Sequence, residues 1–333
     1  MLAEPLAIGS YTARNRVVVP PMANFGLAKQ GGAVTPEHIA HYEAYAAGGA
    51  GLVIVEASGV IPPGNTLGVY DDTCIPGLSG LACAISSHGA VTLVQLLHPG
   101  TRKLPEKEIA QISREDFLYY KTCFVNAAVR CRTAGFHGVE LHAAHGFYLN
   151  EVVENNSRAD EYGGSFENRI RLLQELIAEI KGQCGREFLV AVRFGDRNIQ
   201  ELLRIAAAIE TAGGDLLDVS TGCGGYCGVP AQFAFDSKIY AASLVKGQTS
   251  LPVIGVGNLF TGAQAEAVLE NGYADLAAVG RGRLCDPAWA NKTFSGKTPV
   301  LCRNCSACMW YTDSSRCPAG KRNTKEETNE TSV

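Results

Sequence analysis

Short runs of Val, Ile and Leu alternate with helical patterns along almost the whole chain, and this alternation constrains the fold more than any other feature. Most of the runs are near-continuously apolar, as expected for strands that are buried on both faces. The candidate strands are 16–20, 51–56, 91–97, 138–142, 188–194, 216–220, 252–256 and 275–279. The clearest helical patterns between them are 36–47, 114–133, 166–181, 200–211 and 262–270.

This order of elements predicts the α/β class. Alternating strands and helices favour a parallel sheet with crossover helices, and eight such units favour a closed (β/α)8 TIM barrel. A doubly wound open sheet is the alternative. No Gly-x-Gly-x-x-Gly follows the first strand to support that alternative, and 333 residues suit one barrel with extensions.

The chain divides into three regions on this interpretation. We expect the barrel over residues 1–296, a short Cys-bearing C-terminal extension over 297–320, and a polar, disordered tail over 321–333. A hydrophobic content of 46% and a charged content of 19% are typical of a globular protein with a large core.

Charge and hydropathy narrow the partners. The formal net charge of −4 gives no reason to expect binding to nucleic acid or to a membrane surface. No apolar run approaches the length of a membrane span, and the first residues lack the basic and apolar regions of a signal peptide. We therefore expect a cytoplasmic location.

Four of the 12 cysteines cluster near the C-terminus, whereas the other eight are dispersed and are expected to be free thiols. The cluster is Cys302-x2-Cys305-x2-Cys308-x8-Cys317, followed by proline. Four thiolates at such close spacing suit a [4Fe–4S] cluster or zinc, with free thiols as the third alternative. Cys223 and Cys227 form a weaker pair, which we assign to a glycine-rich loop.

Chemistry in such barrels sits at the carboxyl ends of the strands, so these ends are the place to search for a site. In chain order they carry Pro20 to Ala23, Ala57, Gln95 with His98, His142 with His145, Arg193, Ser220, Gly257, and Gly280 with Arg281. Any one of these polar residues could be a satisfied structural group. Together they favour a site in which His142 and His145 hold a negatively charged oxygen.

The ends of the seventh and eighth strands predict a phosphate site. Glycine there lets backbone N–H groups approach an anion, and Arg281 adds a charged fork between Gly280 and Gly282. Tight turns are the alternative explanation for the glycines, but these two loops are the usual phosphate site of such barrels.

Two segments carry a family resemblance. Residues 138–146 read Gly-Val-Glu-Leu-His-Ala-Ala-His-Gly, and residues 156–169 include Asn-Ser-Arg-Ala-Asp-Glu-Tyr-Gly-Gly-Ser and Glu-Asn-Arg. They resemble the Old Yellow Enzyme family of flavin reductases, including its branch related to bacterial 2,4-dienoyl-CoA reductases. The resemblance implies an FMN-dependent enzyme that transfers hydride from reduced flavin to an activated C=C bond, with NAD(P)H as electron donor. The two histidines would then grip the carbonyl oxygen of a small unsaturated substrate.

The resemblance also implies the cofactor-binding residues. Pro21, Met22 and Ala23 would pack on the isoalloxazine, Gln95 would bind its pyrimidine edge, and Arg193 would lie near flavin N1 and O2. Ala57 would line the same site. Gly257, Gly280 and Arg281 would form its phosphate end.

One residue departs from the family pattern. Phe147 stands two residues after the second histidine, where the family usually has a tyrosine that protonates the substrate. Water, Tyr148 or Arg158 would then have to supply the proton. The segment from His98 to Ile109 and the one after Arg193 are also short, which predicts an open site suited to a bulky substrate or a protein redox partner.

Two other functions stay open on the sequence alone. One is a flavin-free, phosphate-binding barrel lyase or isomerase. The other is a flavin and Fe–S electron-transfer subunit, because the relatives with the cysteine cluster usually carry a second, dinucleotide-binding half. A chain with a cluster but without that half would receive electrons from a donor protein. The sequence assigns no oligomeric state.

Overall fold

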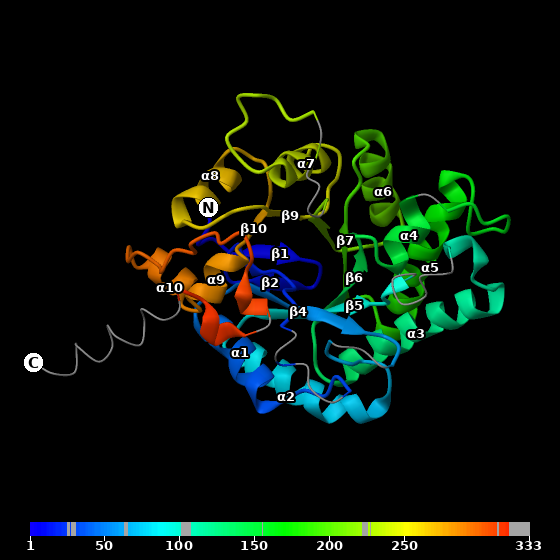
Figure 1. Ribbon diagram of the computed structural model, residues 1–333, viewed down its shortest axis with the longest axis horizontal. Coiled ribbons are helices and arrows are strands. Elements are labelled where there is room, and N and C mark those ends of the chain that lie inside the picture. Colours follow the sequence, from blue (N-terminus) through cyan, green and yellow to red (C-terminus); the bar gives the residue numbers. More distant parts are fainter. Residues whose placement is uncertain are drawn as a thin grey trace, which may run out of the picture.

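Eight parallel strands close into a barrel in the order β10-β3-β4-β5-β6-β7-β8-β9, and helices surround it (Figure 1). The computed structural model describes residues 1–24, 27, 31–62, 66–100, 108–154, 156–221, 226, 228–311 and 313–319. The barrel confirms the predicted (β/α)8 fold and rules out the open sheet. The predicted tail, Cys223 and Cys227 lie outside the described residues.

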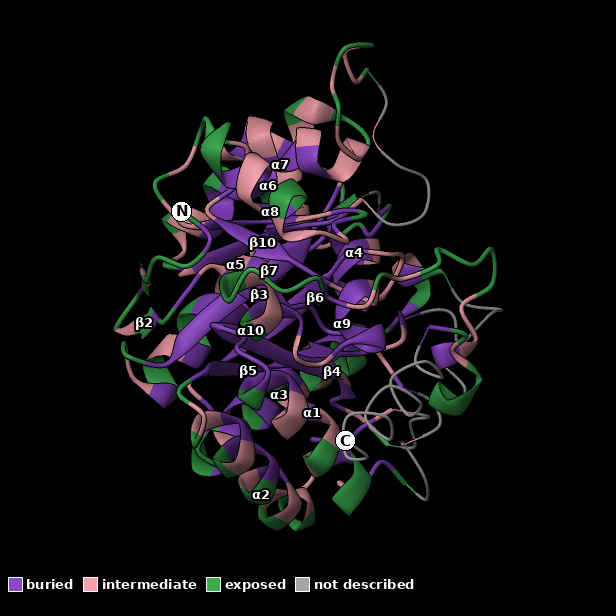
Figure 2. Cartoon of the chain, turned by 90° about the vertical axis from the view of Figure 1, so that its left-hand side faces the viewer, coloured by how far each residue is buried: buried purple, intermediate pink, exposed green. Residues whose placement is uncertain are grey.

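The barrel strands coincide closely with the predicted runs. They are β3 (Val17–Val19), β4 (Leu52–Gly59), β5 (Val91–Leu97), β6 (Gly138–Ala143), β7 (Leu189–Phe194), β8 (Leu216–Val219), β9 (Val253–Val256) and β10 (Leu276–Ala278). Almost every strand residue is buried (Figure 2). Helices cover the outside of the barrel and side chains fill its inside.

The helices begin at clear sequence signals. Thr35, Ser113, Ser165, Asn198, Asp236 and Thr261 each accept a hydrogen bond from a backbone N–H of the first turn that follows. The helices are α1 (Pro36–Ala47), α2 (Ile75–Ser86), α3 (Arg114–Thr133), α4 (Tyr148–Glu154), α5 (Phe166–Cys184), α6 (Ile199–Thr211), α7 (Ser237–Lys246), α8 (Gly262–Glu270), α9 (Arg281–Cys285) and α10 (Trp289–Phe294). No helix in the described part of the chain is long and apolar enough to cross a membrane.

A small hairpin that the sequence pattern did not reveal closes one end of the barrel. Strands β1 (Leu6–Ile8) and β2 (Tyr11–Ala13) pair antiparallel around a tight turn in which Gly9 has a φ of 53°. Ile8 and Ala13 belong to the same buried cluster as inward residues such as Leu93 of β5. The hairpin therefore plugs the end opposite to the strand exits.

Polar side chains replace apolar ones toward the carboxyl ends of the strands. Inward positions alternate along each strand, so Gln95, Glu140, Arg193 and Asp218 follow the apolar residues of β5, β6, β7 and β8. All four are buried, and Glu140 and Asp218 have no exposed surface. This polar layer forms the floor on which a site at the barrel mouth can stand.

The C-terminal extension folds back onto the barrel wall. It contains two single turns of 3-10 helix, η5 (Met309–Tyr311) and η6 (Ser314–Arg316). Trp310 is buried and lies over His41 of α1, with ring centroids 5.1 Å apart. The extension is thereby anchored beside the barrel mouth.

Candidate active site

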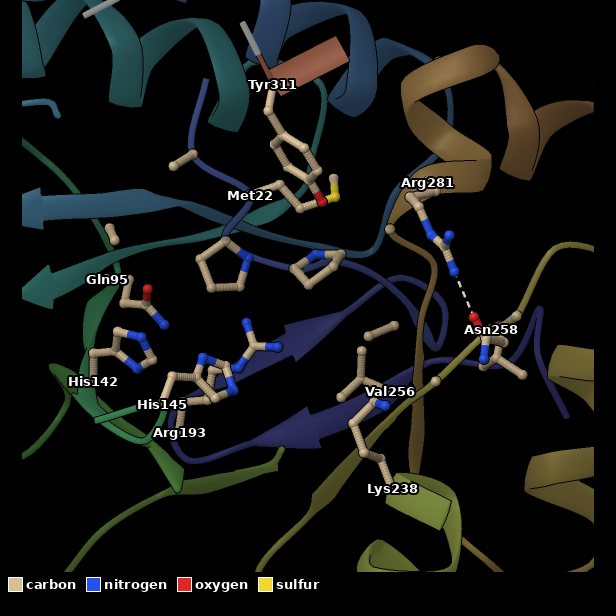
Figure 3. Close-up of a pocket in the computed structure, with 18 of the residues that line it drawn as sticks. Met22, Gln95, His142, His145, Arg193, Lys238, Val256, Asn258, Arg281 and Tyr311 are labelled. Carbon is tan, nitrogen blue, oxygen red and sulfur yellow. Dashed lines mark hydrogen bonds between the residues drawn. The ribbon is translucent and has the colours of Figure 1, made fainter. Parts of the chain in front are cut away.

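A cavity of about 390 Å³ lies at the carboxyl ends of the barrel strands (Figure 3). It is large enough for a small organic ligand. Residues that the sequence singled out line it together: Pro21, Met22, Ala23, Ala57, Gln95, His142, His145, Arg193, Gly257, Gly280 and Arg281. The structure thus brings every predicted cofactor residue and both histidines to one cavity.

A β-bulge in β4 turns Ala57 toward this cavity. The register with β5 shifts between Val55 and Ser58, so one extra residue is accommodated there. Glu56 instead contacts α1, where it accepts a hydrogen bond from the Tyr42 hydroxyl at 3.2 Å. Burial raises the pKa of the Glu56 carboxyl to about 7.

The two histidines stand side by side on the cavity wall. Their ring centroids are 5.0 Å apart, and the two ring planes are nearly perpendicular. His145 has a φ of 64°, an uncommon conformation that turns the chain sharply after β6. The backbone N–H of Gly146 donates to the Asn150 side chain at 2.6 Å, and His145 Nε2 lies 2.9 Å from Ser220 Oγ. These contacts hold the His145 imidazole at the cavity, which His142 also lines.

The floor of the cavity pairs charges and amides. Gln95 Nε2 donates to Glu140 Oε1 at 2.7 Å. Arg193 Nε lies 3.4 Å from Asp218 Oδ2, and its Nη2 donates to Ser220. Burial raises the pKa of Glu140, and the nearby Asp218 raises it further. Burial also raises the pKa of the Asp218 carboxyl, whereas the nearby Arg193 guanidinium lowers it. Arg193 is thus the cation that both buried carboxyl groups face below the cavity.

Cationic side chains gather at the end of the cavity that Gly257 and Gly280 line. Gly257 has a φ of 155°, and a Cβ there would lie 2.6 Å from Asp236 Cβ. Lys238 Nζ pairs with Asp236 at 2.9 Å, and Arg281 donates to Asn258 (Figure 3). Two cations face one carboxylate here, so this end has a net positive charge suited to a phosphate group.

Phe147 and Tyr148 point in different directions. Phe147 lines the cavity, with its ring centroid 5.0 Å from that of His142. Tyr148 is buried behind the wall, where its ring lies 4.7 Å from that of His98. Its hydroxyl has no hydrogen-bond partner among the described residues and does not line the cavity. Tyr148 is therefore not positioned to protonate a substrate held by the histidines.

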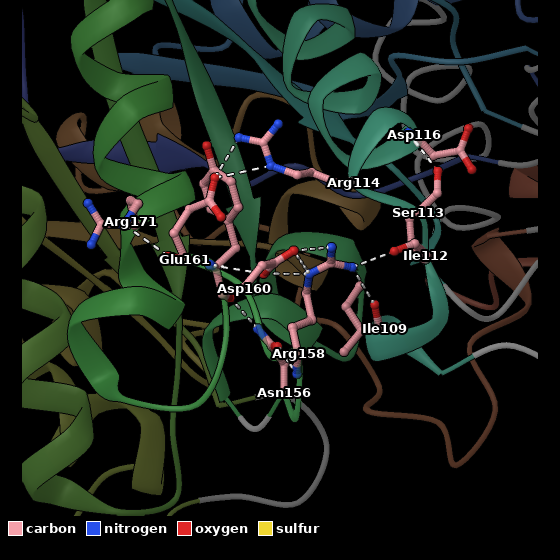
Figure 4. Close-up of polar contacts among 11 residues, drawn as sticks. Ile109, Ile112, Ser113, Arg114, Asp116, Asn156, Arg158, Asp160, Glu161 and Arg171 are labelled. Carbon is pink, nitrogen blue, oxygen red and sulfur yellow. Dashed lines mark hydrogen bonds and ion pairs between the residues drawn. The ribbon is translucent and has the colours of Figure 1, made fainter.

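Arg158 does not line the cavity either, and Figure 4 shows its polar contacts. Its Nη1 donates to the carbonyl oxygens of Ile112 at 2.6 Å and Ile109 at 3.2 Å. Its other guanidinium nitrogens bind Asp160. Arg158 thus ties the segment after α4 to the segment before α3, which is a structural role rather than the proton-donor role considered from the sequence.

A profile of the NADH:flavin oxidoreductase / NADH oxidase family matches residues 1–113 and 103–298 of the chain. The chain belongs to this family. It is 34% identical over 316 residues to an NADPH dehydrogenase of Bacillus licheniformis, which covers 86% of this chain and 92% of that protein. It is also 34% identical to an NADH oxidase of Thermoanaerobacter brockii, covering 90% of this chain and 52% of that protein.

A solved structure agrees in fold. The Old Yellow Enzyme homologue of Zymomonas mobilis superposes with a TM-score of 0.78 at 23% identity, over 94% of this chain and 99% of that one. The chain is therefore a member of a family of flavin oxidoreductases, and it shares its barrel fold with an Old Yellow Enzyme homologue. The resemblance to Old Yellow Enzymes is confirmed. The flavin-free lyase or isomerase is no longer needed to explain the cavity.

The four clustered cysteines of this family member do not converge as placed. Cys302, Cys308 and Cys317 are partly buried, whereas Cys305 is exposed. Among the described residues, no three His, Cys, Asp or Glu side chains are arranged to hold a metal ion. Burial raises the pKa of the Cys285 thiol, and the neighbouring Cys302 and Cys317 raise it further. Cys285, which the sequence spacing did not implicate, is therefore a close neighbour of two of the four.

Several cavity residues of this flavin oxidoreductase were missed from the sequence. Lys238 follows the loop after β8, and Tyr311 comes from the C-terminal extension, so neither stands at a predicted strand end. A second, larger cavity of about 1130 Å³ adjoins the first and extends over Gly195, Asp196 and Arg197. The short connection from β7 to α6, residues 195–198, leaves this side open, as its length had indicated.

Proposed function

We propose that the cavity binds FMN and that the enzyme reduces a C=C bond conjugated to a carbonyl group. The observation that carries this proposal is the convergence of the His142 and His145 pair, Arg193 and the positively charged glycine end in a single cavity. Each of these groups addresses a different part of one flavin and one substrate. A phosphate-binding barrel without flavin would not require the histidine pair and Arg193 beside it.

The residues present fit FMN. Gln95 and Arg193 would face the pyrimidine edge, while Gly257, Gly280 and Arg281 would hold the phosphate, with Lys238 adding a second cation. When bound and reduced, FMN supplies a hydride. Arg193 would stabilise negative charge on the reduced ring, and the two imidazoles would donate hydrogen bonds to the substrate oxygen as charge develops on it.

Two observations restrict the range of candidate electron donors and substrates. The similarity to NADPH dehydrogenases over most of both chains favours direct reduction by NADPH. The second cavity, open beside His145, favours a substrate that extends beyond its reacting carbonyl. We therefore propose a small unsaturated carbonyl compound with an extended conjugated or polar part.

The four clustered cysteines of the C-terminal extension are candidate metal ligands. A [4Fe–4S] cluster or zinc on Cys302, Cys305, Cys308 and Cys317 would require these side chains to move from their present positions, since they do not form a metal site as placed. No step of the proposed reaction depends on it. With a cluster, a donor protein would become an alternative source of electrons.

Replacement of Arg193 tests the assignment of the flavin site. Arg193→Ala alone would leave Asp218 buried without its cation, so the Arg193→Ala/Asp218→Asn double variant is the informative one, with Asp218→Asn as its matched control. We expect the double variant to bind FMN at least about 10-fold more weakly, or to be reduced more slowly by NADPH, in fluorescence titration and stopped-flow absorbance. Wild-type affinity and reduction rate in the double variant would refute the role of Arg193.

A further inference from the structure

We propose that Tyr311, carried by the Cys-bearing extension, is the acid that protonates the substrate in place of Phe147. This inference rests on the proposed reductase function and names a catalytic residue for it. Phe147 occupies the cavity wall beside His142 and has no proton to donate. Tyr311 lines the same cavity and comes from η5 of the C-terminal extension.

The two cavities meet at Tyr311. The residues that line both of them are His145, Arg193, Lys238, Arg281 and Tyr311, so these five side chains surround the junction. Figure 3 shows the Tyr311 ring entering the cavity from above. A substrate whose oxygen is held by His145 and whose body extends into the second cavity must pass this junction.

The three cationic side chains at the junction already have partners within the protein. Lys238 pairs with Asp236 at 2.9 Å, Arg281 donates to Asn258 and Asn304, and Arg193 contacts Asp218 and Ser220. Within the described parts of the chain, no hydrogen bond of the Tyr311 hydroxyl competes with a substrate. Its proton is therefore available to a group that enters the cavity.

Two anchors fix where Tyr311 stands. The preceding residue, Trp310, is buried against His41 of α1. Asn304, earlier in the extension, accepts a hydrogen bond from Arg281 at the barrel mouth. The extension is thus held against α1 and at the barrel mouth, which gives the Tyr311 phenol a defined position.

The chemistry balances with Tyr311 as the acid. The β-carbon of the substrate would accept the hydride that bound, reduced FMN would supply, and the π-electron pair of the C=C bond would move toward the carbonyl oxygen. The two histidines would stabilise the negative charge on that enolate oxygen. As the enolate collapses, its α-carbon takes the proton of the Tyr311 hydroxyl, and water in the second cavity returns a proton to the phenolate. Burial raises the pKa of Tyr311, so the phenol carries its proton at neutral pH.

Tyr311→Phe tests this role, because it removes one oxygen and keeps the ring. We expect reoxidation of the reduced enzyme by cyclohexenone to slow by about 100-fold, which is the lower end of the usual contribution of a general acid. FMN affinity, the rate of reduction by NADPH and the spectral shift caused by a bound phenol should remain unchanged. Tyr119→Phe, on the exposed surface of α3, is the matched control and should behave as the wild type.

Rescue and product analysis make the test specific. Phe147→Tyr added to Tyr311→Phe should restore most of the rate, because it returns a phenol beside His142. In deuterated water the wild type should place deuterium at the α-carbon with one stereochemistry, and Tyr311→Phe should lose that selectivity. Equal rates and equal stereochemistry in wild type and Tyr311→Phe would overturn the role of Tyr311 alone. Absence of FMN binding or of enone reduction in the wild type would overturn the proposed function as well.

Discussion

At the level of single residues, the bulge in β4 directs the neighbouring side chains of Glu56 and Ala57 to different surroundings. Ala57 lines the cavity, whereas Glu56 is buried between the strand and α1. Glu56 accepts hydrogen bonds from the Tyr42 hydroxyl and the Asn24 backbone N–H, both at 3.2 Å. These bonds reduce the desolvation penalty without removing it, so the carboxyl keeps a pKa raised to about 7.

Glu56→Gln should therefore change the pH dependence of stability. The pKa of Glu56 is about 7 in the folded protein and 4.5 as its ordinary value, so the wild type loses stability relative to the variant as pH rises between these values. The free energy of unfolding of the variant should gain on the order of 3 kcal/mol over that of the wild type from pH 4 to pH 8. Urea unfolding across this range measures it, and a difference that does not change with pH would contradict the argument.

At the scale of elements, the segment between α4 and α5 is held by one arginine. Arg158 reaches across to the chain before α3 and binds two backbone carbonyl groups there, while Asp160 binds its other side (Figure 4). Its guanidinium also lies over the Phe117 ring, 4.7 Å from the centroid. The region that carries the family resemblance is thus partly a packing motif rather than a catalytic one.

Arg158→Ala should destabilise the fold by about 3 kcal/mol, because it leaves buried carbonyl groups without donors and Asp160 without its cation. Arg114→Ala is the matched control, since Arg114 pairs with Glu161 in the same region but on the exposed surface, and little change is expected there. Thermal unfolding of the three proteins measures the difference. FMN content should be the same in all folded samples; a flavin-free but fully stable Arg158→Ala protein would contradict the structural role.

At the level of the whole molecule, one end of the barrel is closed and the other end carries the candidate active site. The β1–β2 hairpin closes one end, and the cavity, the second cavity and the C-terminal extension occupy the other. The extension therefore does more than carry cysteines, because Tyr311 and Asn304 connect it to the barrel mouth. The extension and the short loop after β7 both border the second cavity.

The strands and the strand-end residues could be predicted because they follow local rules. A buried parallel strand must be apolar, and its exit must carry the chemistry, so Gln95, His142 and Arg193 could be located from spacing alone. Tyr311 could not, because its position depends on how Trp310 packs against α1, which is a contact between distant parts of the chain. The direction of Tyr148 depends likewise on the unusual φ of His145, which no sequence pattern expresses.

One anaerobic measurement tests directly whether this barrel uses bound FMN to reduce an activated C=C bond. The purified protein is loaded with FMN, reduced with NADPH until the flavin absorbance near 450 nm is bleached, and mixed with cyclohexenone in a stopped-flow spectrophotometer. We expect the oxidised flavin spectrum to return at a rate that depends on the enone concentration, and cyclohexanone to form in equal amount. A flavin that stays reduced with every unsaturated ketone offered, while oxygen still reoxidises it, would rule out this reaction.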